Sequence, residues 1–370
     1  MKKPRENLPV PADTVPHEIV APLLSWYDES ARILPWRENP EPYRVWISEI
    51  MLQQTRVEAA KPYYDRFLEE LPDVSALACV PEEQLMKLWE GLGYYNRARN
   101  LQKAAKVLME KHSGQLPASF EALLELPGFG EYTAGAVSSI AFGIRVPAVD
   151  GNVLRVISRI LGSREDVTRP DVKRSITEGV RQILPERVGD FNQALMELGA
   201  MVCLPNGAPR CDICPEAFLC EGYRQGIMAQ LPVKPEKKAR KIQQRTVWIL
   251  VAQDGEGISR VALHKRDESG LLAGLWEFPN AEGMLSPAES RRRAAEWGLV
   301  LRKQQTLEPA KHIFSHIEWR MTGYLASLAG VPEKSDFFWA DSRQLEKECT
   351  VPSAFKAYLA EAMKALNQSD

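Results

Sequence analysis

The chain has 370 residues, of which 45% are hydrophobic and 26% charged, and its formal net charge at pH 7 is −2. At roughly 100–200 residues per domain, this length predicts two or three domains. The ordinary composition excludes disordered, collagen-like and low-complexity chains, and the near-neutral charge means that any basic surface for a nucleic acid is local.

The N-terminal residues and the apolar runs argue against membrane targeting. Residues 1–16 carry basic side chains and prolines, whereas a signal peptide needs roughly 7–15 consecutive apolar residues, so we expect a tail there. The longest apolar run, near Val247 to Ala252, is far shorter than the ~20 residues of a membrane helix. We therefore expect a cytoplasmic protein that binds no membrane.

Residues 17–225 are predicted to form an all-α domain. Apolar residues recur there at helical spacing, as in Leu101, Ala104, Ala105 and Leu108. Almost no stretch alternates between apolar and polar residues with period two, which is the pattern of a half-buried strand.

Two acidic residues in this domain are candidates for chemistry. Glu49 lies within the strongly apolar helical segment VWISEIMLQQT, where burial would raise its pKa and let it donate a proton near neutral pH. A salt-bridged Glu49 is the alternative. Asp150 precedes Gly151 at a predicted helix start, which is also the position of an ordinary N-cap.

A glycine-containing turn lies between these two residues. In LPGFGEYTA, Gly128 and Gly130 directly precede a helical run. Backbone N–H groups at such a helix start bind phosphate, and glycine permits close approach of a DNA backbone. Taken alone, a Pro-Gly turn before a helix is more often only a turn.

Four of the six cysteines lie in one short stretch, with seven, two and five residues between them: Cys203, Cys211, Cys214 and Cys220. Six cysteines are too few for a disulfide framework at this length. Structural zinc usually takes two short-spaced pairs, whereas only one such pair occurs here. The spacing favours a [4Fe–4S] cluster, with zinc or unliganded thiols as alternatives.

The character of the chain changes after residue 225. Residues 226–245 are rich in Lys, Arg and Pro and are predicted to be a basic linker, lying near phosphates or serving as a solvated tether. Strands are expected at 245–253, 260–266 and 321–328, and helices at 288–297 and 353–366. Residues 246–370 are therefore predicted to form an α+β domain.

Six motifs, in this order, resemble those of the MutY family of adenine DNA glycosylases in the helix–hairpin–helix base-excision repair superfamily. They are LPWR (34–37), PYRVWISEIMLQQT (42–55), GLGYYNRA (91–98), LPGFGEYTA (126–134), VDGNVLRV (149–156) and the cysteine loop (203–220). The resemblance implies an all-α helix–hairpin–helix domain with an iron–sulfur loop, followed by an α+β Nudix-like domain. It implies hydrolysis of the N-glycosidic bond of adenine opposite 8-oxoguanine or guanine in duplex DNA, after base flipping.

The resemblance also assigns catalytic roles. It implies that Glu49 protonates N7 of the adenine, and that Asp150 stabilises the oxocarbenium-like sugar with help from Tyr132. Lyase members of the superfamily carry a lysine at the position of Tyr132, and a phenol cannot form a Schiff base. We therefore expect a monofunctional glycosylase.

The remaining site residues are likewise implied by the resemblance. Gly128 and Gly130 would contact the DNA backbone, and Phe314, Ser315 and His316 would recognise 8-oxoguanine. The other substrate-binding candidates are Trp36, Arg37, Leu52, Gln54, Thr55, Leu92, Tyr94, Asn152 and Gln193. Among these, Gln54 and Tyr94 match the residues that wedge into the duplex, whereas Trp36 and Leu52 are equally compatible with ordinary core positions.

The second domain resembles Nudix hydrolases through GLLAGLWEFP (270–279) and FSH (314–316). A working Nudix enzyme needs a glutamate-rich helix to hold Mg²⁺. Here the corresponding stretch, SRRRAAEWGL, retains Glu296 among arginines. Pyrophosphate hydrolysis is therefore not expected.

One departure and two rival functions accompany this interpretation. The family usually has six residues between its first two cysteine ligands, whereas seven lie between Cys203 and Cys211.

The first rival function is that of an endonuclease III-like glycosylase and lyase acting on damaged pyrimidines, which Tyr132 opposes. The second is that of a catalytically silent lesion-binding protein, which Glu49 and Asp150 oppose. We expect a nucleoid-associated bacterial monomer whose partner is double-stranded DNA.

Overall fold

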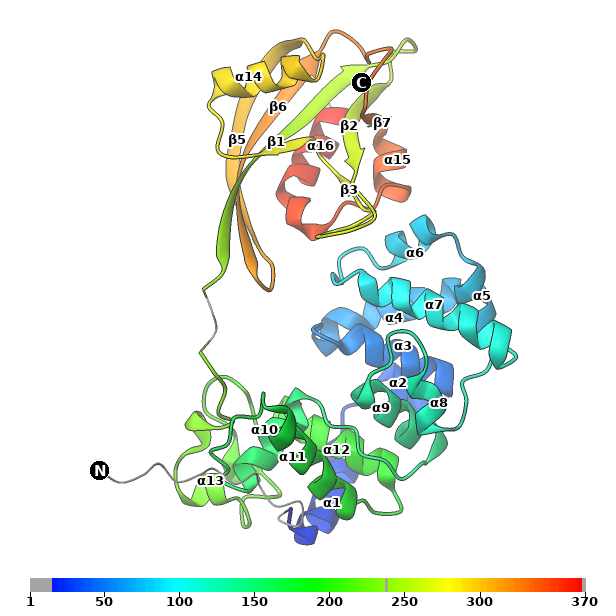
Figure 1. Ribbon diagram of the computed structural model, residues 1–370, viewed down its shortest axis with the longest axis vertical. Coiled ribbons are helices and arrows are strands. Elements are labelled where there is room, and N and C mark those ends of the chain that lie inside the picture. The colour runs from blue at the N-terminus through cyan, green and yellow to red at the C-terminus, as the bar shows by residue number, and fades with distance from the viewer. Residues whose placement is uncertain (1–14, 237–238, 368–370) are drawn as a thin grey trace. The chain divides into compact units, whose positions relative to one another are not determined.

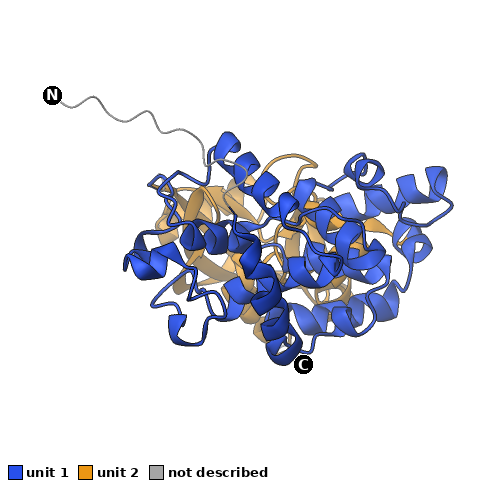
Figure 2. Cartoon of the chain, turned by 90° about the horizontal axis from the view of Figure 1, so that it is seen from below, with its two compact units in different colours: residues 1–79, 100–237 blue, residues 80–99, 238–370 orange. Residues whose placement is uncertain are grey.

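The structure, a computed structural model, describes residues 15–236 and 239–367 (Figure 1). The chain forms two compact units, coloured separately in Figure 2. Unit 1 comprises residues 1–79 and 100–237, and unit 2 comprises residues 80–99 and 238–370. No helix within the described ranges combines the length and the apolar character that crossing a bilayer requires.

Unit 1 is helical, as predicted. The short 3-10 helix η2 (His17–Ile19) leads into α1, and another, η3 (Cys211–Ile213), lies in the cysteine loop. Its α-helices are α1 (Val20–Ser30), α2 (Pro35–Glu38), α3 (Pro42–Leu52), α4 (Val57–Glu70), α5 (Val74–Cys79), α8 (Phe120–Leu124), α9 (Glu131–Phe142), α10 (Gly151–Ile160), α11 (Pro170–Gln182), α12 (Val188–Met201) and α13 (Glu221–Arg224). Helix α6 (Glu82–Leu88) belongs to unit 2, and α7 (Asn96–Lys111) begins in unit 2 and continues into unit 1.

Proline residues lie at the start of three of these helices and favour helix initiation there. Pro35, Pro42 and Pro170 each lie in the first turn of α2, α3 and α11, where a missing N–H costs no intrahelical hydrogen bond. A core of apolar side chains from α1, α10, α11 and α12 includes Val15, which is only 6% exposed. The predicted tail, residues 1–16, is therefore too long by at least two residues, because Val15 packs into this core.

A close backbone approach places the segment before α10. A Cβ atom on Gly135 of α9 would lie 2.3 Å from the carbonyl oxygen of Pro147, so this helix position requires glycine. The buried Asn192 side chain of α12 accepts a hydrogen bond from Ala148 N and donates one to the Val146 carbonyl. Helices α9 and α12 thus hold the segment that leads to Asp150.

Unit 2 contains a twisted sheet with helices on both faces (Figure 1). Its main strand order is β3-β2-β1-β6-β5, with β4 paired to β1 and β7 to β2. The strands are β1 (Lys241–Gln253), β2 (Ser259–Lys265), β3 (Trp276–Glu277), β4 (Asn280–Glu282), β5 (Leu301–Ile313), β6 (Ile317–Leu328) and β7 (Phe338–Ala340). The central pair β1 and β6 is parallel and the other pairs are antiparallel.

The two faces of the sheet have separate cores. Val247 and Ile249 of β1 belong to the core that also includes residues of α16 (Lys356–Asn367) and α15 (Ser342–Lys347). Trp248 and Leu250 belong to the core that includes Ala294 of α14 (Pro287–Glu296). Where β1 is covered on both faces, from Val247 to Ala252, its sequence is a continuous apolar run, as is typical of a central strand.

The second unit departs from the sequence prediction most in its two longest strands, β1 and β5, and the short elements β3, β4, β7 and α15 were not predicted. Strand β1 begins at Lys241, so the last five residues of the predicted linker 226–245 are strand residues paired with β6. Strand β5 was not predicted, because LRKQQTLEPAKHI is an exposed, polar edge strand without a regular apolar alternation. The domain limits of 17–225 and 246–370 otherwise stay a prediction.

Candidate active site

Glu49 is a buried carboxyl group whose partner is a hydroxyl rather than a cation. It lies on α3 and is 6% exposed. The Tyr132 hydroxyl of α9 donates a 2.6 Å hydrogen bond to Glu49 Oε2 and lies 3.1 Å from Met196 Sδ of α12. Within the described ranges, Glu49 has no ion pair of 4 Å or less, so the alternative of a salt-bridged glutamate is wrong.

Burial raises the pKa of the Glu49 carboxyl to about 7. The hydrogen bond from Tyr132 and the charge of Arg37 oppose this rise, whereas the negative charge of Asp150 adds to it. A carboxyl group with this pKa is protonated in a large fraction of molecules at neutral pH, which is the requirement for a general acid.

Asp150 is the N-cap of α10, so the ordinary structural role considered for it is real. Its Oδ1 accepts 2.8 Å hydrogen bonds from the backbone N–H groups of Asn152 and Val153. The Asn152 side chain donates a 2.7 Å hydrogen bond to Oδ2. Burial raises the pKa of Asp150, while these hydrogen bonds oppose the rise by stabilising the carboxylate. The cap therefore also favours a fixed, ionised carboxylate near Glu49.

The predicted pocket residues divide into polar and packing groups. Arg37 donates a 3.1 Å hydrogen bond from Nε to Gln193 Oε1. Trp36 is buried and packs edge to face on Tyr64 with 5.2 Å between ring centroids, which fits the core role considered for it. Leu52 is partly exposed at the C-terminal end of α3.

The predicted wedge residues have unusual backbone conformations. Gln54 (φ 64°) and Tyr94 (φ 48°) are two of four non-glycine residues with positive φ among the described residues. Tyr94 is 54% exposed, whereas Leu92 is buried. Strained backbone at exposed side chains is often found where a ligand is contacted. Thr55, beside Gln54, has a buried hydroxyl for which the described residues supply no hydrogen-bond partner.

The predicted hairpin forms a tight turn before α9. Gly128 has φ 81°, and a Cβ atom there would lie 2.7 Å from Asn100 Cβ. Gly130 is the N-cap of α9 and provides no side-chain cap for the helix. The N–H groups of the first helical turn lack intrahelical partners, so they are available to an anion such as a DNA phosphate.

The four clustered cysteines line one cavity together with Arg159 of α10. None of them forms a disulfide, and the Arg159 guanidinium donates to Cys203 Sγ at 3.2 Å. Burial raises the pKa of the Cys211, Cys214 and Cys220 thiols. In residues 15–236 and 239–367, no group of three or more His, Cys, Asp or Glu side chains is arranged to hold a single metal ion.

The predicted lesion-contacting residues form the turn between β5 and β6. Phe314 N donates a 2.8 Å hydrogen bond to the Ile317 carbonyl, and the Phe314 ring packs edge to face on Trp319 with centroids 4.9 Å apart. Ser315 and His316 are exposed at the tip. Within unit 2, the hydroxyl of Tyr94 lies 3.2 Å from Ser315 Oγ.

The carboxylates of α14 are engaged in local contacts. Glu289 completes a capping box with Ser286 at the start of the helix. Glu296 pairs with Arg293 at 3.3 Å. Each of the two glutamates of α14 thus has a partner within residues 286–296.

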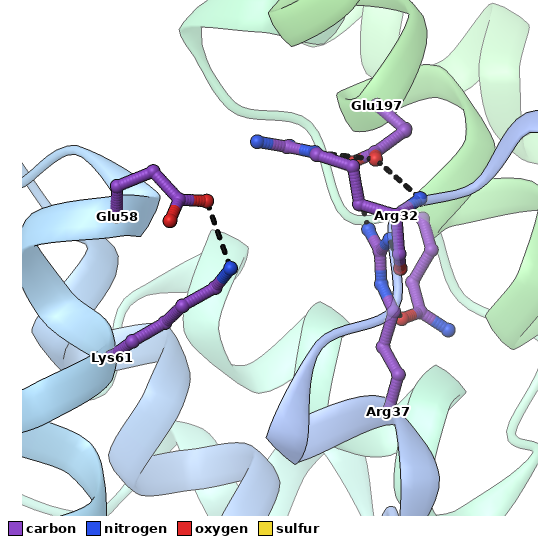
Figure 3. A network of polar contacts seen from close by, with 6 residues as sticks. Arg32, Arg37, Glu58, Lys61 and Glu197 are labelled. Atoms are coloured by element: carbon purple, nitrogen blue, oxygen red, sulfur yellow. Dashed lines mark hydrogen bonds and ion pairs between the residues drawn. The ribbon is translucent and has the colours of Figure 1, made fainter.

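Arg32 and Glu197, two polar residues of this region, were missed by the sequence interpretation. Arg32 and Arg37 both donate to the carboxylate of Glu197 on α12, which is 1% exposed (Figure 3). Glu197 lies one helical turn after Gln193 in the apolar segment FNQALMELGAM. A carboxylate in an apolar helix was the signal that identified Glu49, and the same signal would have found Glu197.

Comparison with known proteins defines the class of enzyme first. Residues 47–182 match the HhH-GPD superfamily of base excision DNA repair proteins, and residues 246–361 match the NUDIX domain. The structure is also similar to that of a thermostable thymine-DNA glycosylase, with a TM-score of 0.52 and 30% identity, over 56% of this chain and 97% of that one. The chain is thus a helix–hairpin–helix DNA glycosylase with a second, Nudix-like domain.

Its relatives then define the family. The adenine DNA glycosylase of Mus musculus is 37% identical over 84% of this chain and 70% of that protein. The adenine DNA glycosylase of Schizosaccharomyces pombe is 34% identical over 91% of this chain and 88% of that protein. The chain belongs to the MutY family of adenine DNA glycosylases.

Proposed function

We propose that this enzyme hydrolyses the N-glycosidic bond of adenine opposite 8-oxoguanine or guanine in duplex DNA, without cleaving the strand. The observation that carries the proposal is the buried Glu49, whose pKa is about 7, hydrogen-bonded to Tyr132 and close enough to Asp150 to sense its charge. One protonated and one ionised carboxyl group are what acid-assisted glycosidic cleavage needs.

Each of the three residues has a distinct task in this mechanism. The Glu49 carboxyl donates its proton to N7 of a flipped adenine, which makes the neutral base a better leaving group. The Asp150 carboxylate, fixed by the Asn152 and Val153 N–H groups, stabilises the positive charge that develops on the sugar. Tyr132 holds Glu49 in place by its hydrogen bond. Water then completes the hydrolysis.

The side chain of Tyr132 supports a monofunctional reaction. It lies at the start of α9, in contact with the catalytic acid. A phenol cannot form the imine with the sugar that strand cleavage by a lyase requires. This observation favours the proposal over an endonuclease III-like glycosylase and lyase.

Exposed residues supply the contacts with the mispair. Gln54 and Tyr94 offer strained, solvent-facing positions for entering the duplex, at a flipping cost of about a few kcal/mol. Ser315 and His316 offer polar groups at a hairpin tip for recognising 8-oxoguanine opposite the adenine. The Ser315–Tyr94 contact within unit 2 supports a shared role for these two residues.

A [4Fe–4S] cluster fits the cavity of the cysteine loop. Single zinc ions need ligand sulfurs about 2.3 Å from one point, and the described residues contain no group arranged to hold one ion. The four cysteines nevertheless share one cavity, which suits a larger core, and the Arg159 guanidinium would offset the negative charge of the thiolates. When bound, the cluster would supply rigidity and charge to the loop, with Cys203, Cys211, Cys214 and Cys220 as its ligands.

A single-turnover assay on oligonucleotide duplexes tests the proposed function. The wild-type protein should release free adenine faster opposite 8-oxoguanine or guanine than opposite cytosine, and the strand should break only after alkali treatment. Glu49→Gln and Asp150→Asn should nearly abolish release while retaining DNA binding, and the exposed Glu178→Gln should change neither. Absence of adenine release, or release of damaged pyrimidines instead, would overturn the proposal.

The expected monomeric state and cytoplasmic, nucleoid-associated location are further parts of this proposal. A single lesion offers one asymmetric site, which one chain is sufficient to bind. Sedimentation of the protein with and without a lesion duplex should give a one-to-one complex; a stable two-to-one complex would contradict the monomer.

A further inference from the structure

We propose that the ion pair between Arg32 and Glu197 is a positioning device for base selection: it anchors Arg37, and through Arg37 it fixes the orientation of the Gln193 amide. The inference rests on the proposed function, because it takes adenine as the substrate and places the substrate-binding candidate Gln193 at the edge of that base. Figure 3 shows Arg32 and Arg37 converging on the Glu197 carboxylate.

The Glu197 carboxylate is fully engaged by two arginines. Oε1 accepts hydrogen bonds from Arg32 N at 3.1 Å and Arg32 Nε at 2.7 Å. Oε2 accepts from Arg32 Nη2 at 2.7 Å and Arg37 Nη2 at 2.9 Å. Because Arg32 lies in the loop between α1 and α2 and Arg37 lies in α2, these bonds tie the loop and α2 to α12.

All three nitrogens of the Arg37 guanidinium are engaged. Nη2 donates to Glu197, Nη1 donates to the Arg32 carbonyl at 3.1 Å, and Nε donates to Gln193 Oε1. The Arg37 guanidinium also lies 5.4 Å from the centroid of the Tyr27 ring. A planar guanidinium held at every nitrogen has one orientation, so its Nε presents a fixed donor to Gln193.

A fixed donor decides which way the Gln193 amide faces. An amide has an acceptor oxygen and a donor NH₂ group, and rotation by 180° exchanges them. Because Arg37 Nε donates to Oε1, the exchanged orientation would place two donors against each other. Gln193 therefore keeps one order of donor and acceptor toward a bound base.

This order distinguishes adenine from 6-oxopurines. On its N1 edge, adenine presents the acceptor N1 beside the donor N6 amino group, whereas a 6-oxopurine presents the donor N1–H beside the acceptor O6. An amide free to rotate would pair with either base. An amide held by Arg37 pairs with adenine and leaves an unpaired polar group against hypoxanthine, and such mismatches produce large discrimination.

The buried charge of Glu197 makes the device rigid. Burial would raise the pKa of this carboxyl, but the hydrogen bonds and charges of Arg32 and Arg37 lower it to about 2. The carboxylate therefore stays ionised across the working pH range. Loss of Glu197 would leave both arginines without their shared counterion, and loss of Arg32 would leave the buried carboxylate with Arg37 alone.

Another ion pair, between α1 and the start of α12, provides a control. Arg187, the N-cap of α12, pairs with Asp28 of α1 at 2.6 Å, but both side chains are about half exposed, and the pair does not contact Arg37 or Gln193. A general stabilising role for the ion pairs that tie residues 28–32 to α12 and its N-cap would make Asp28→Asn and Arg32→Gln behave alike. If the Arg32–Glu197 pair positions Arg37 and Gln193, only Arg32→Gln should change the preference for adenine.

The experiment measures single-turnover excision of adenine and of hypoxanthine, each opposite 8-oxoguanine, by the full-length protein. Glu197→Gln and Arg32→Gln should lower the preference for adenine over hypoxanthine at least tenfold, and Asp28→Asn should leave it unchanged. In a Gln193→Ala background, Glu197→Gln should cause no further loss of preference. Arg32→Lys, which keeps the charge but loses the bidentate geometry, serves if the other variants fold poorly, and it should lower the preference as well.

The outcomes separate this inference from the proposed function. A wild-type protein that releases no adenine overturns both. An active wild-type protein whose preference survives in the Arg32 and Glu197 variants overturns the positioning role alone. Rates that fall equally for both bases, in step with a lower Tm, would show a merely structural ion pair.

Discussion

At the residue scale, the buried carboxyl group of Glu49 couples catalysis to stability. Desolvation disfavours the charged form, so the folded protein holds a proton that the unfolded chain would release near pH 4.5. The raised pKa keeps Glu49 protonated near neutral pH. It also makes the native state less stable once Glu49 loses that proton. The raised pKa of Glu49 should therefore affect the pH dependence of both excision and stability.

The first prediction concerns the pH dependence of excision. Because Glu49 acts in its protonated form and has a pKa of about 7, the single-turnover rate should fall about tenfold for each pH unit above 7. At acidic pH the rate should fall again, as Asp150 gains a proton. Rates measured between pH 5 and 9 check this, with Glu49→Gln as the control, whose small residual rate should lack the alkaline limb. A wild-type rate that is flat above pH 7 would contradict the acid role.

The second prediction concerns stability. Between pH 4.5 and about 7 the native state binds more protons at Glu49 than the unfolded state, so unfolding free energy falls as the pH rises through this window. A pKa raised from 4.5 to about 7 corresponds to at most about 3 kcal/mol, at about 1.36 kcal/mol per pKa unit. Glu49→Gln should therefore stabilise the protein relative to wild type at pH 8 but not at pH 4.

Urea denaturation at these two pH values measures the difference. The exposed Glu178→Gln serves as a control and should shift the midpoint at neither pH. If Glu49→Gln destabilises the protein equally at pH 4 and pH 8, the raised pKa of Glu49 is wrong.

At the scale of elements, sequence patterns identified what local residues determine. The apolar segment around Glu49 predicted a buried helix and its unusual acid, and Asp150 was correctly placed at a helix start. Strand β5 was missed because an edge strand exposes most of its residues, so burial imposes no alternation on its sequence. The Arg32–Glu197 pair was missed because its partners are 165 positions apart and only the folded chain brings them together.

For the turn between β5 and β6, we predict a role in the preference for 8-oxoguanine. Phe314 packs between His312 and Trp319, with ring centroids 4.6 and 4.9 Å away, so the tip is anchored while Ser315 and His316 face solvent. Replacing both tip residues with alanine should lower the preference for opposing 8-oxoguanine over guanine about tenfold, the effect of about 1.4 kcal/mol of lost hydrogen bonding. The rate at guanine mispairs should change little.

Single-turnover rates with each opposing base measure that preference. The matched control is Glu256→Ala at the tip of the β1–β2 hairpin, another exposed turn of the same sheet. An unchanged preference in the Ser315 and His316 double variant would remove the turn from lesion recognition.

At the scale of the whole molecule, a net charge of −2 means that any basic surface for DNA is local. The contacts proposed above need no overall positive charge. The hairpin offers backbone N–H groups, which need no cationic side chain, and the wedge candidates Gln54 and Tyr94 are uncharged. Phosphate and base contacts of this kind leave no trace in the overall composition.

The cysteine loop supports a last prediction, on metal content and stability. Purified protein should contain about four iron atoms per chain and absorb near 400 nm, because four thiolates of one cavity suit a [4Fe–4S] core. Cys211→Ser should reduce the iron content and lower the Tm by about 5 °C or more, since ligand binding to the native state contributes to folding free energy. The exposed Cys79, outside the loop, provides the control: Cys79→Ser should retain iron and Tm. Stoichiometric zinc in place of iron, or a Cys211→Ser variant with full iron content, would show that the loop does not hold this cluster.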